Sequence, residues 1–340
     1  MNFSSCGVSF SSRGALAPLL VTLILLLTAC AGNQDAFNPA GPQSGQIKSL
    51  WLLMFWISVL VELGVAVALF GALLRRNQTE TPEAESRATR NVGYALAFTV
   101  LTVLVILIAS ALTGRSLAST PKNEFNINVT GHQWWWNFEY TDGAPNDRFQ
   151  SPNEIHIPTG RPVRLHLTSV DVIHSFWVPN LHGKMDAIPA HNNTYWLQAD
   201  KPGVFWGQCA EFCGLQHAHM KFMVIAEEPA KFEQWRDAQR APSALPRGDE
   251  QNTGRQVFLN SPCPVCHMIR GTDAHGRVGP ELTHLASRQT IAAGTLPNTR
   301  GNLGGWIVDS HRIKPGNNMP PMHLLSEQVE PLLTYLENLK

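Results

Sequence analysis

The chain has 340 residues, enough for two or three domains, and its 26 basic and 26 acidic side chains give a formal net charge of zero. That balance offers nothing to attract nucleic acid or another polyanionic partner. Charged residues make up only 15% of the chain, below the roughly one quarter that is typical of soluble domains, which indicates membrane segments.

The N-terminal segment has the pattern of an export signal. Residues 15–27 form an apolar run of h-region length directly behind Arg13. Leu27-Thr28-Ala29-Cys30 resembles a bacterial lipoprotein cleavage box, so we predict a signal peptide over residues 1–29 and a lipidated Cys30. The alternative is an ordinary signal peptide in which this cysteine is incidental. The Gly-, Pro-, Asn- and Gln-rich stretch that follows predicts a flexible periplasmic tether over residues 30–49.

Two apolar stretches, residues 50–74 and 92–112, are each long enough to span a bilayer as a helix. The loop between them carries four arginines: Arg75, Arg76, Arg87 and Arg90. By the positive-inside rule this loop is cytoplasmic and both ends face the periplasm, which predicts a transmembrane hairpin over residues 50–115. Glu62 falls in mid-span, where it is either a protonated side chain bonded to a partner subunit or part of a proton path.

Residues 120–229 have the pattern of a β-domain. Short stretches that alternate, or that are rich in aromatic and β-branched residues, are separated by Gly, Pro and Asn: 161–169, 195–197, 203–208 and 220–226. No helical period interrupts them, which predicts a β-sandwich or Greek-key barrel. A short helix and a linker follow over residues 230–246, and residues 247–340 form a second domain of helical character, with Ser326 as the N-cap of its last helix.

The loop Cys209-Ala-Glu-Phe-Cys213-Gly-Leu-Gln-His217-Ala-His-Met220 places two thiols, an imidazole and a thioether within twelve residues. These soft and borderline ligands suit copper, and His174 can complete the site from another loop. Two thiolates four residues apart can bridge two copper ions, with His174 and His217 each capping one. Met220 and the backbone carbonyl of Glu211 are placed as weak axial ligands.

The Cys209–Cys213 pair has alternatives to copper. A Cys-x3-Cys segment by itself is compatible with a disulfide, a zinc half-site or a copper-chaperone motif. The additional His217, Met220 and His174 favour a resident copper centre.

The segment Cys263-Pro-Val-Cys266-His267 is a covalent c-type haem attachment motif. Cys263 and Cys266 would form the thioether links, and His267 would be the proximal iron ligand. A zinc half-site is the alternative, but no second Cys or His pair follows at zinc spacing. A distal thioether would come from Met319 or Met322, and His/Met ligation raises the haem potential as an electron carrier requires.

Three further runs carry a family resemblance: Gly131-His-Gln-Trp-Trp-Trp-Asn-Phe-Glu-Tyr140, His174-Ser-Phe-Trp-Val-Pro179 and Lys184-Met-Asp-Ala-Ile-Pro189. With the copper loop and the paired helices, they make residues 45–229 resemble cytochrome c oxidase subunit II of the copper-A type. The added haem domain resembles bacterial subunits II with a fused C-terminal cytochrome c. The resemblance implies two transmembrane α-helices, an all-β cupredoxin-like sandwich and a small all-α class I cytochrome c domain.

The resemblance also implies roles for single residues. The copper-A ligands map onto His174, Cys209, Glu211 (backbone carbonyl), Cys213, His217 and Met220. The Glu211 side chain corresponds to a ligand of magnesium at the subunit I interface, and Trp134 to the point where electrons enter from cytochrome c. Class I cytochromes favour Met319 as the distal ligand, and the carbonyl of Pro280 as the acceptor of the His267 ring N–H.

One departure from the family concerns proton uptake. Family members often begin the second helix with a glutamate followed shortly by a tryptophan. Residues 86–94 contain no carboxylate, and Glu83 and Glu85 lie nearby without aligning. The resemblance therefore leaves open whether Glu62, Glu83 or Glu85 serves proton entry into the complex.

These features together predict the electron-input subunit of a respiratory haem–copper oxidase in a bacterial cytoplasmic membrane. Electrons would pass from cytochrome c or an upstream membrane complex through haem c and copper A to a haem of subunit I, where dioxygen is reduced and protons are translocated. Subunit III is a further expected partner. The alternatives are a copper-A nitric oxide reductase and a copper carrier; a quinol oxidase subunit II is disfavoured because that branch lacks the copper ligands.

Overall fold

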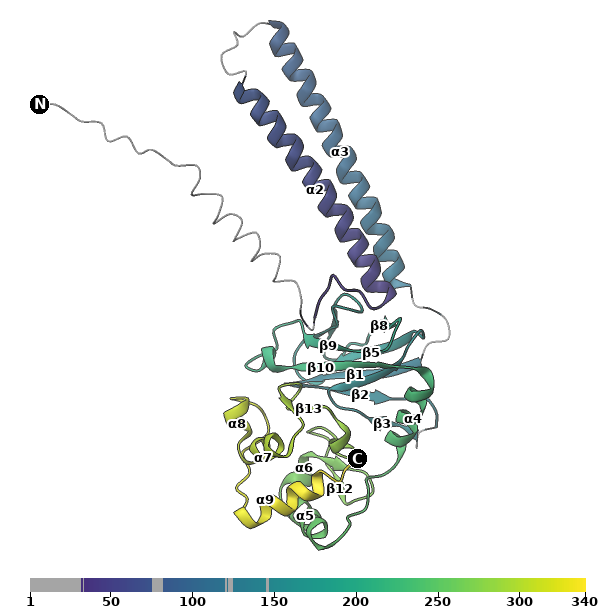
Figure 1. The fold of residues 1–340 in the computed structure, drawn as a ribbon, viewed down its shortest axis with the longest axis vertical. Helices are drawn as coiled ribbons and strands as arrows, with labels where there is room; N and C mark the ends of the chain where they lie inside the picture. The colour runs from purple at the N-terminus through teal and green to yellow at the C-terminus, as the bar shows by residue number, and fades with distance from the viewer. Residues whose placement is uncertain (1–31, 33, 75–81, 120, 122–124, 145–146) are drawn as a thin grey trace, which may run out of the picture.

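The computed structural model describes the chain except for residues 1–31, 33, 75–81, 120, 122–124 and 145–146. The predicted signal peptide, Cys30, Arg75 and Arg76 lie outside the described residues. Figure 1 shows three parts in succession: a pair of long helices, a β-sandwich below them, and a helical domain on the side of the sandwich away from the long helices.

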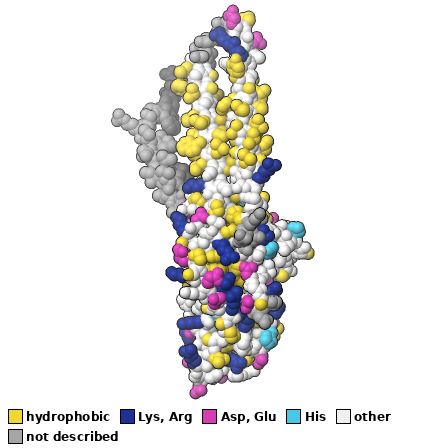
Figure 2. Space-filling model, turned by 90° about the vertical axis from the view of Figure 1, so that its right-hand side faces the viewer, with side chains coloured by type: hydrophobic (Ala, Val, Ile, Leu, Met, Phe, Trp, Pro, Cys, Tyr) yellow, Lys and Arg dark blue, Asp and Glu magenta, His cyan; other side chains and the backbone are white. Residues whose placement is uncertain are grey.

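The long helices are α2 (Pro42–Leu74) and α3 (Pro82–Ala118). Both are apolar enough to cross a membrane, because each contains an 18-residue stretch of high mean hydropathy, 2.4 in α2 and 2.7 in α3. Their side chains are mostly exposed in the isolated chain, and Figure 2 shows hydrophobic side chains covering both helices. An apolar surface of this kind is stable only against lipid or other membrane helices. The two predicted spans are therefore confirmed as candidate membrane helices, and each is longer than its apolar stretch.

The segment in front of α2 is docked on the sandwich, which differs from the flexible tether expected here. The side-chain amide of Asn180 donates to the carbonyl oxygens of Asp35 (2.9 Å) and Asn38 (3.0 Å). The Ala40 amide and the Ser44 hydroxyl both donate to the Asn180 carbonyl, at 2.8 and 2.7 Å. Most of these partners are backbone groups, which the composition of the segment does not reveal, and they give it a defined path across the β-domain.

The β-domain is a two-layered sandwich, as predicted. One sheet has the order β3-β2-β1-β5-β8, with β1 (Phe125–His132), β2 (Trp135–Tyr140), β3 (Phe149–Gln150), β5 (Val163–Ser169) and β8 (Asn193–Leu197). The other has the order β4-β10-β9-β6-β7, with β4 (Glu154–Pro158), β6 (His174–Trp177), β7 (Met185–Ala187), β9 (Gly203–Cys209) and β10 (Lys221–Glu227). Alternate residues of β1, β2 and β5 are buried, and rings such as Trp136, Phe176 and Phe222 fill the core between the sheets.

Strand pairing in the second sheet brings His174 and the cysteine loop together. β6 runs antiparallel to β9, with Phe176 opposite Cys209. The loop that starts at Cys209 contains the 3₁₀ turn η2 (His217–His219) and returns into β10, closed at its base by the Cys209 N–H donating to the Met220 carbonyl at 3.0 Å. His174 at the start of β6 therefore lies beside a loop that follows it by more than thirty residues.

After β10, α4 (Pro229–Arg240) confirms the predicted short helix, and the C-terminal domain is helical as expected. Its helices are α5 (Asp249–Asn260), α6 (Cys263–Cys266), α7 (Arg300–Val308), α8 (Ser310–Ile313) and α9 (Ser326–Leu336). Two short strand pairs, β11 (Met268–Ile269) with β12 (Ala274–His275) and β13 (Thr290–Ile291) with β14 (Leu296–Pro297), are additions to the predicted helical pattern. Ser326 is the first residue of α9 rather than its cap; Leu325 holds the cap position, and its N–H donates to the Gln328 side chain at 2.9 Å.

The C-terminal domain depends on the close approach of α5 to α9. A Cβ atom on Gly254 would lie 1.9 Å from the carbonyl oxygen of Pro331, a backbone atom that cannot rotate aside. We expect Gly254→Ala to destabilise this domain by about 1–3 kcal/mol, the usual effect of overpacking. Thermal unfolding of the purified chain measures the effect. The matched control is Gly301→Ala in α7, where nothing lies within 4 Å of the added methyl group and stability should not fall.

Candidate functional site

The two thiols of the cysteine loop lie side by side. The Sγ atoms of Cys209 and Cys213 are 3.8 Å apart, both side chains are buried, and neither is in a disulfide. A disulfide would require about 2 Å between the sulfurs. The Nδ1 atom of His174 lies 3.9 Å from the sulfur of Cys209, and that of His217 lies 3.6 Å from the sulfur of Cys213. Each imidazole thus accompanies a different thiol.

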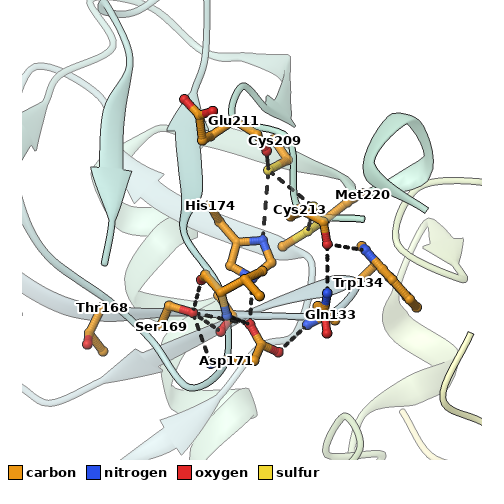
Figure 3. Close-up of polar contacts among 12 residues, drawn as sticks. Gln133, Trp134, Thr168, Ser169, Asp171, His174, Cys209, Glu211, Cys213 and Met220 are labelled. Carbon is orange, nitrogen blue, oxygen red and sulfur yellow. Dashed lines mark hydrogen bonds and ion pairs between the residues drawn. The ribbon is translucent and has the colours of Figure 1, made fainter. Parts of the chain in front are cut away.

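Two weaker donors complete the cluster. The Met220 Sδ atom lies 3.9 Å from the Cys213 sulfur, and the Glu211 carbonyl oxygen lies 3.2 Å from the Cys209 sulfur. Figure 3 shows His174, Met220 and the backbone of Glu211 around the sulfur pair. A single tetrahedral zinc ion would use two thiolates and two imidazoles and leave the thioether and the carbonyl without a role. Four donors around two thiol sulfurs fit a binuclear copper centre, with the soft thiol ligands in the middle.

Electrostatics indicate that the thiol pair is built for a cation. Hydrogen bonding with Cys213, together with that with His174, lowers the pKa of Cys209 despite its burial. The same pairing raises the pKa of Cys213, because a second thiolate beside the first is repelled. A bound cation would stabilise both thiolates, which agrees with the neighbouring neutral donors.

Asp171 orients the His174 ring, a role that sequence reasoning missed. Its Oδ1 atom lies 2.8 Å from His174 Nε2, which leaves Nδ1 facing the sulfurs. The amides of Gln133 (2.6 Å) and Val172 (2.7 Å) also donate to this carboxylate. Burial acts against the charged form, but the hydrogen bonds outweigh it and lower the pKa of Asp171. The only signal in the sequence was an acidic residue three positions before a histidine.

Replacing Asp171 tests this orienting role. We expect Asp171→Ala to weaken copper retention by roughly 10–100-fold, the usual effect of removing the hydrogen-bond partner of a metal-bound histidine. Copper content after a graded chelator challenge measures it. Asp237→Ala, which removes an exposed carboxylate on α4, is the matched control and should retain copper normally. Equal retention in the two variants would contradict the role of Asp171.

The three adjacent tryptophans have different surroundings. Trp136 is fully buried in the core, and Trp135 stacks on His132 at 4.1 Å between ring centroids. Trp134 lies in the turn between β1 and β2, and its indole N–H donates to the Cys213 carbonyl at 2.9 Å. The Gln133 side chain donates to the same carbonyl at 2.8 Å. Of the three rings, Trp134 is the one hydrogen-bonded to the backbone of a cluster residue.

The side chain of Glu211 is separate from the sulfur cluster. It is 44% exposed, and its carboxylate lies 3.5 Å from the ammonium group of Lys184. Figure 3 shows it pointing away from the two sulfurs, although its backbone carbonyl faces Cys209. Among the described residues, only His174, Cys209 and Cys213 form a compact group of His, Cys or acidic donors. A magnesium ion at Glu211 would therefore need ligands from a partner.

The haem-attachment motif lies on α6, with Cys263 and Cys266 at its two ends. The Nδ1 atom of His267 lies 2.7 Å from the Pro280 carbonyl oxygen, the contact that the family resemblance implies, and Nε2 is left for iron. A Cβ atom on Gly279 would come within 2.7 Å of the imidazole, so this position needs glycine. Burial, partly opposed by the Pro280 hydrogen bond, lowers the pKa of His267 and favours the neutral ring that ligates metals.

The two candidate distal methionines also differ. Met322 packs against the hydrophobic core of the C-terminal domain. Met319 lies in the loop after α8, half-buried and outside that core, with its backbone held by the Asn317 side chain at 2.8 Å and the Ser310 hydroxyl at 2.5 Å. The assignment of the distal haem ligand to Met319 stays a prediction, with Met322 as the alternative.

Comparisons with known proteins identify relatives of both soluble domains. Residues 143–227 match the family "Cytochrome C oxidase subunit II, periplasmic domain", and residues 251–340 match "Cytochrome c". A cytochrome c oxidase subunit 2 of Alkalihalophilus pseudofirmus is 37% identical over 331 residues, covering 94% of this chain and 95% of that protein. One from Bacillus subtilis is 28% identical over 349 residues, covering 95% and 97%. The crystal structure of the periplasmic domain of subunit II of Bradyrhizobium japonicum cytochrome oxidase is 34% identical with a TM-score of 0.34, covering 36% of this chain and 97% of that one.

Proposed function

Because this chain belongs to the cytochrome c oxidase subunit II family and has a C-terminal cytochrome c domain, we propose that it passes electrons from haem c to a binuclear copper A and on to the haem of subunit I. The chain is subunit 2 of a cytochrome c oxidase, a membrane protein with two candidate spans and a periplasmic domain. Dioxygen reduction and proton translocation would take place in subunit I.

The observation that carries the proposal is the convergence of four donors on one pair of thiol sulfurs, which makes six donors in all. His174, Cys209, Glu211 (backbone carbonyl), Cys213, His217 and Met220 would hold the copper ions. Cys263 and Cys266 would hold the haem covalently, with His267 and Met319 at the iron. Bound in these sites, the two groups would each supply a reversible one-electron carrier.

The protein supplies rigidity and exclusion of water. Both cysteine sulfurs, His174 and Met220 are buried, so the positions of these ligating atoms change little when one electron is added or removed. The hydrogen bond from Trp134 to the Cys213 carbonyl gives a short bonded route from this turn to a copper ligand. We infer that Trp134 is the residue through which electrons reach the copper centre.

The chain is placed in its membrane and among its partner subunits by the same proposal. It lies in a bacterial cytoplasmic membrane with the α2–α3 connection on the cytoplasmic side and both metal domains outside, after cleavage of the signal peptide and lipidation of Cys30. α2 and α3 pack against subunit I, and subunit III is a further neighbour in the haem–copper oxidase complex. Glu211 shares a magnesium ion with subunit I. Cytochrome c or an upstream membrane complex is the electron donor.

Metal analysis of the purified complex tests the proposal. We expect two copper ions and one covalent haem per chain in addition to the metals of subunit I, with an electron-spin spectrum in which one unpaired electron couples to two copper nuclei. The complex should reduce dioxygen and not nitric oxide. A single-copper spectrum would contradict the binuclear centre. Turnover of nitric oxide in place of dioxygen would assign the chain to a copper-A nitric oxide reductase.

A further inference from the structure

The haem domain contacts the copper domain through the loop that precedes Met319. Figure 1 shows the C-terminal domain lying against the sandwich, with β13 and α8 nearest to it. Residues 314–318 of this loop make hydrogen bonds to the turn that carries Trp134 and to the copper loop. The segment that holds the proposed haem ligand is thus the segment that meets the proposed copper site.

Lys314 is the centre of this contact. Its side chain is almost completely buried, and its ammonium group donates to three backbone carbonyls: His219 at 2.8 Å, Trp134 at 3.3 Å and Ala292 at 3.3 Å. No ion pair with a carboxylate is present for Lys314 among the described residues. A lysine buried without a carboxylate partner is costly unless its three protons are all bonded. The arrangement therefore favours one geometry of three segments, two from the copper domain and one from the haem domain.

A second set of contacts surrounds Lys314. The Asn318 side chain donates to the Gln133 carbonyl at 2.9 Å, and the Gln216 side chain of the copper loop donates to the Pro315 carbonyl at 2.7 Å. Lys314 and Asn318 thereby bind the carbonyls of two consecutive residues, Trp134 and Gln133. Trp134 is only 9% exposed and belongs to the hydrophobic core of the sandwich.

Further hydrogen bonds that do not involve residues 314–318 also join the two domains. The Glu154 carboxylate accepts from the amides of Gln289 (2.7 Å) and Thr290 (3.1 Å), and the Lys221 amide donates to the Ala293 carbonyl at 3.1 Å. Loss of the Lys314 contacts would therefore loosen the docking at Trp134 without separating the domains.

We propose that Lys314 and Asn318 are positioning residues: they hold the haem domain against the turn that contains Trp134. In that position they set the rate of electron transfer from the haem to the copper centre. The proposal rests on the proposed function. One electron leaves the ferrous haem, which becomes ferric, and the oxidised copper pair is reduced by one electron; no bond is made or broken. The Asn318–Gln133 and Trp134–Cys213 hydrogen bonds link the backbone next to Met319 to a copper ligand. A separate donor protein then delivers its electron to the haem domain, because this domain occupies the face at Trp134.

The test uses the intact oxidase complex with Lys314→Met, Asn318→Ala and the double variant. The haem is reduced by a light flash with a soluble ruthenium dye, and reduction of the copper centre is followed optically. We expect transfer to be at least roughly tenfold slower in the double variant, since losing charge-assisted hydrogen bonds shifts a docking equilibrium by that order. The haem absorption and the copper electron-spin spectrum should be unchanged, and the amides of residues 131–136 should exchange faster with deuterium. Lys201→Met, an exposed lysine of the copper domain, is the control.

The possible results distinguish a failure of the positioning role of Lys314 and Asn318, called the latch below, from a failure of the proposed function. An unchanged transfer rate in the double variant overturns the latch. An altered copper spectrum in Lys314→Met also overturns it, because Lys314 would then build the copper loop rather than position the haem domain. If Lys314→Met does not fold, the exposed Asn318→Ala still tests the rate. Absence of the copper or haem signal in the unmodified complex would instead contradict the proposed function, and the latch with it.

Discussion

Cys213→Ser is expected to abolish the binuclear copper spectrum while the haem absorption stays intact. The Cys213 sulfur lies 3.8 Å from Cys209, 3.6 Å from His217 and 3.9 Å from Met220, so it is in contact with three other donors of the cluster. A serine hydroxyl is a hard, weakly acidic donor and does not replace a bridging thiolate for copper. Copper analysis and electron-spin spectra of the purified complex measure the loss.

A buried neighbour serves as the control for this change. Ser175 adjoins His174, is fully buried, and its hydroxyl has no hydrogen-bond partner among the described residues. Ser175→Ala should therefore keep both copper ions. Cys213→Ser with a normal two-copper spectrum would remove Cys213 from the centre. Loss of haem together with copper in a folded variant would show that the two sites do not lie in separate domains.

Met319→Leu is expected to lower the haem reduction potential by on the order of 0.1 V, a fraction of the roughly 0.8 V range that axial ligands span. Leucine removes a thioether that favours ferrous iron, while the links through Cys263 and Cys266 and the proximal His267 remain. Electron flow into copper should slow accordingly. A redox titration of the haem absorption in the complex measures the shift.

The matched change is Met322→Leu. Met322 packs in the core of the C-terminal domain, where exchange of methionine for leucine conserves volume and is normally tolerated. The haem reduction potential of the Met322→Leu variant should match that of the unmodified chain. If the potential shifts in Met322→Leu and stays constant in Met319→Leu, the distal ligand is Met322.

The amino-acid sequence alone determined those features whose parts are close together in the chain. The copper loop presents two thiols, an imidazole and a thioether between Cys209 and Met220, so any compact conformation of that loop brings them near one another. The haem motif is equally local, since Cys263, Cys266 and His267 share a single turn and the following residue. The membrane helices follow from composition, because a long apolar stretch has few other environments in which it is stable.

The tertiary structure decided what depends on contacts between distant segments. Strand pairing places His174 beside Cys209, and the resulting loop geometry gives Asp171 its role as the partner of the imidazole. Sequence spacing likewise could not assign separate roles to three consecutive tryptophans, because their burial follows from the turn between β1 and β2.

The contact between the two metal domains depends most completely on tertiary structure. Lys314 lies 180 residues from Trp134 in the sequence, and its hydrophilic side chain predicts exposure. Burial of its ammonium group is stable only because three carbonyls from three separate segments converge on it. Local sequence patterns show which chemical groups a chain possesses. Contacts between segments that are distant in the sequence determine which of those groups lie together.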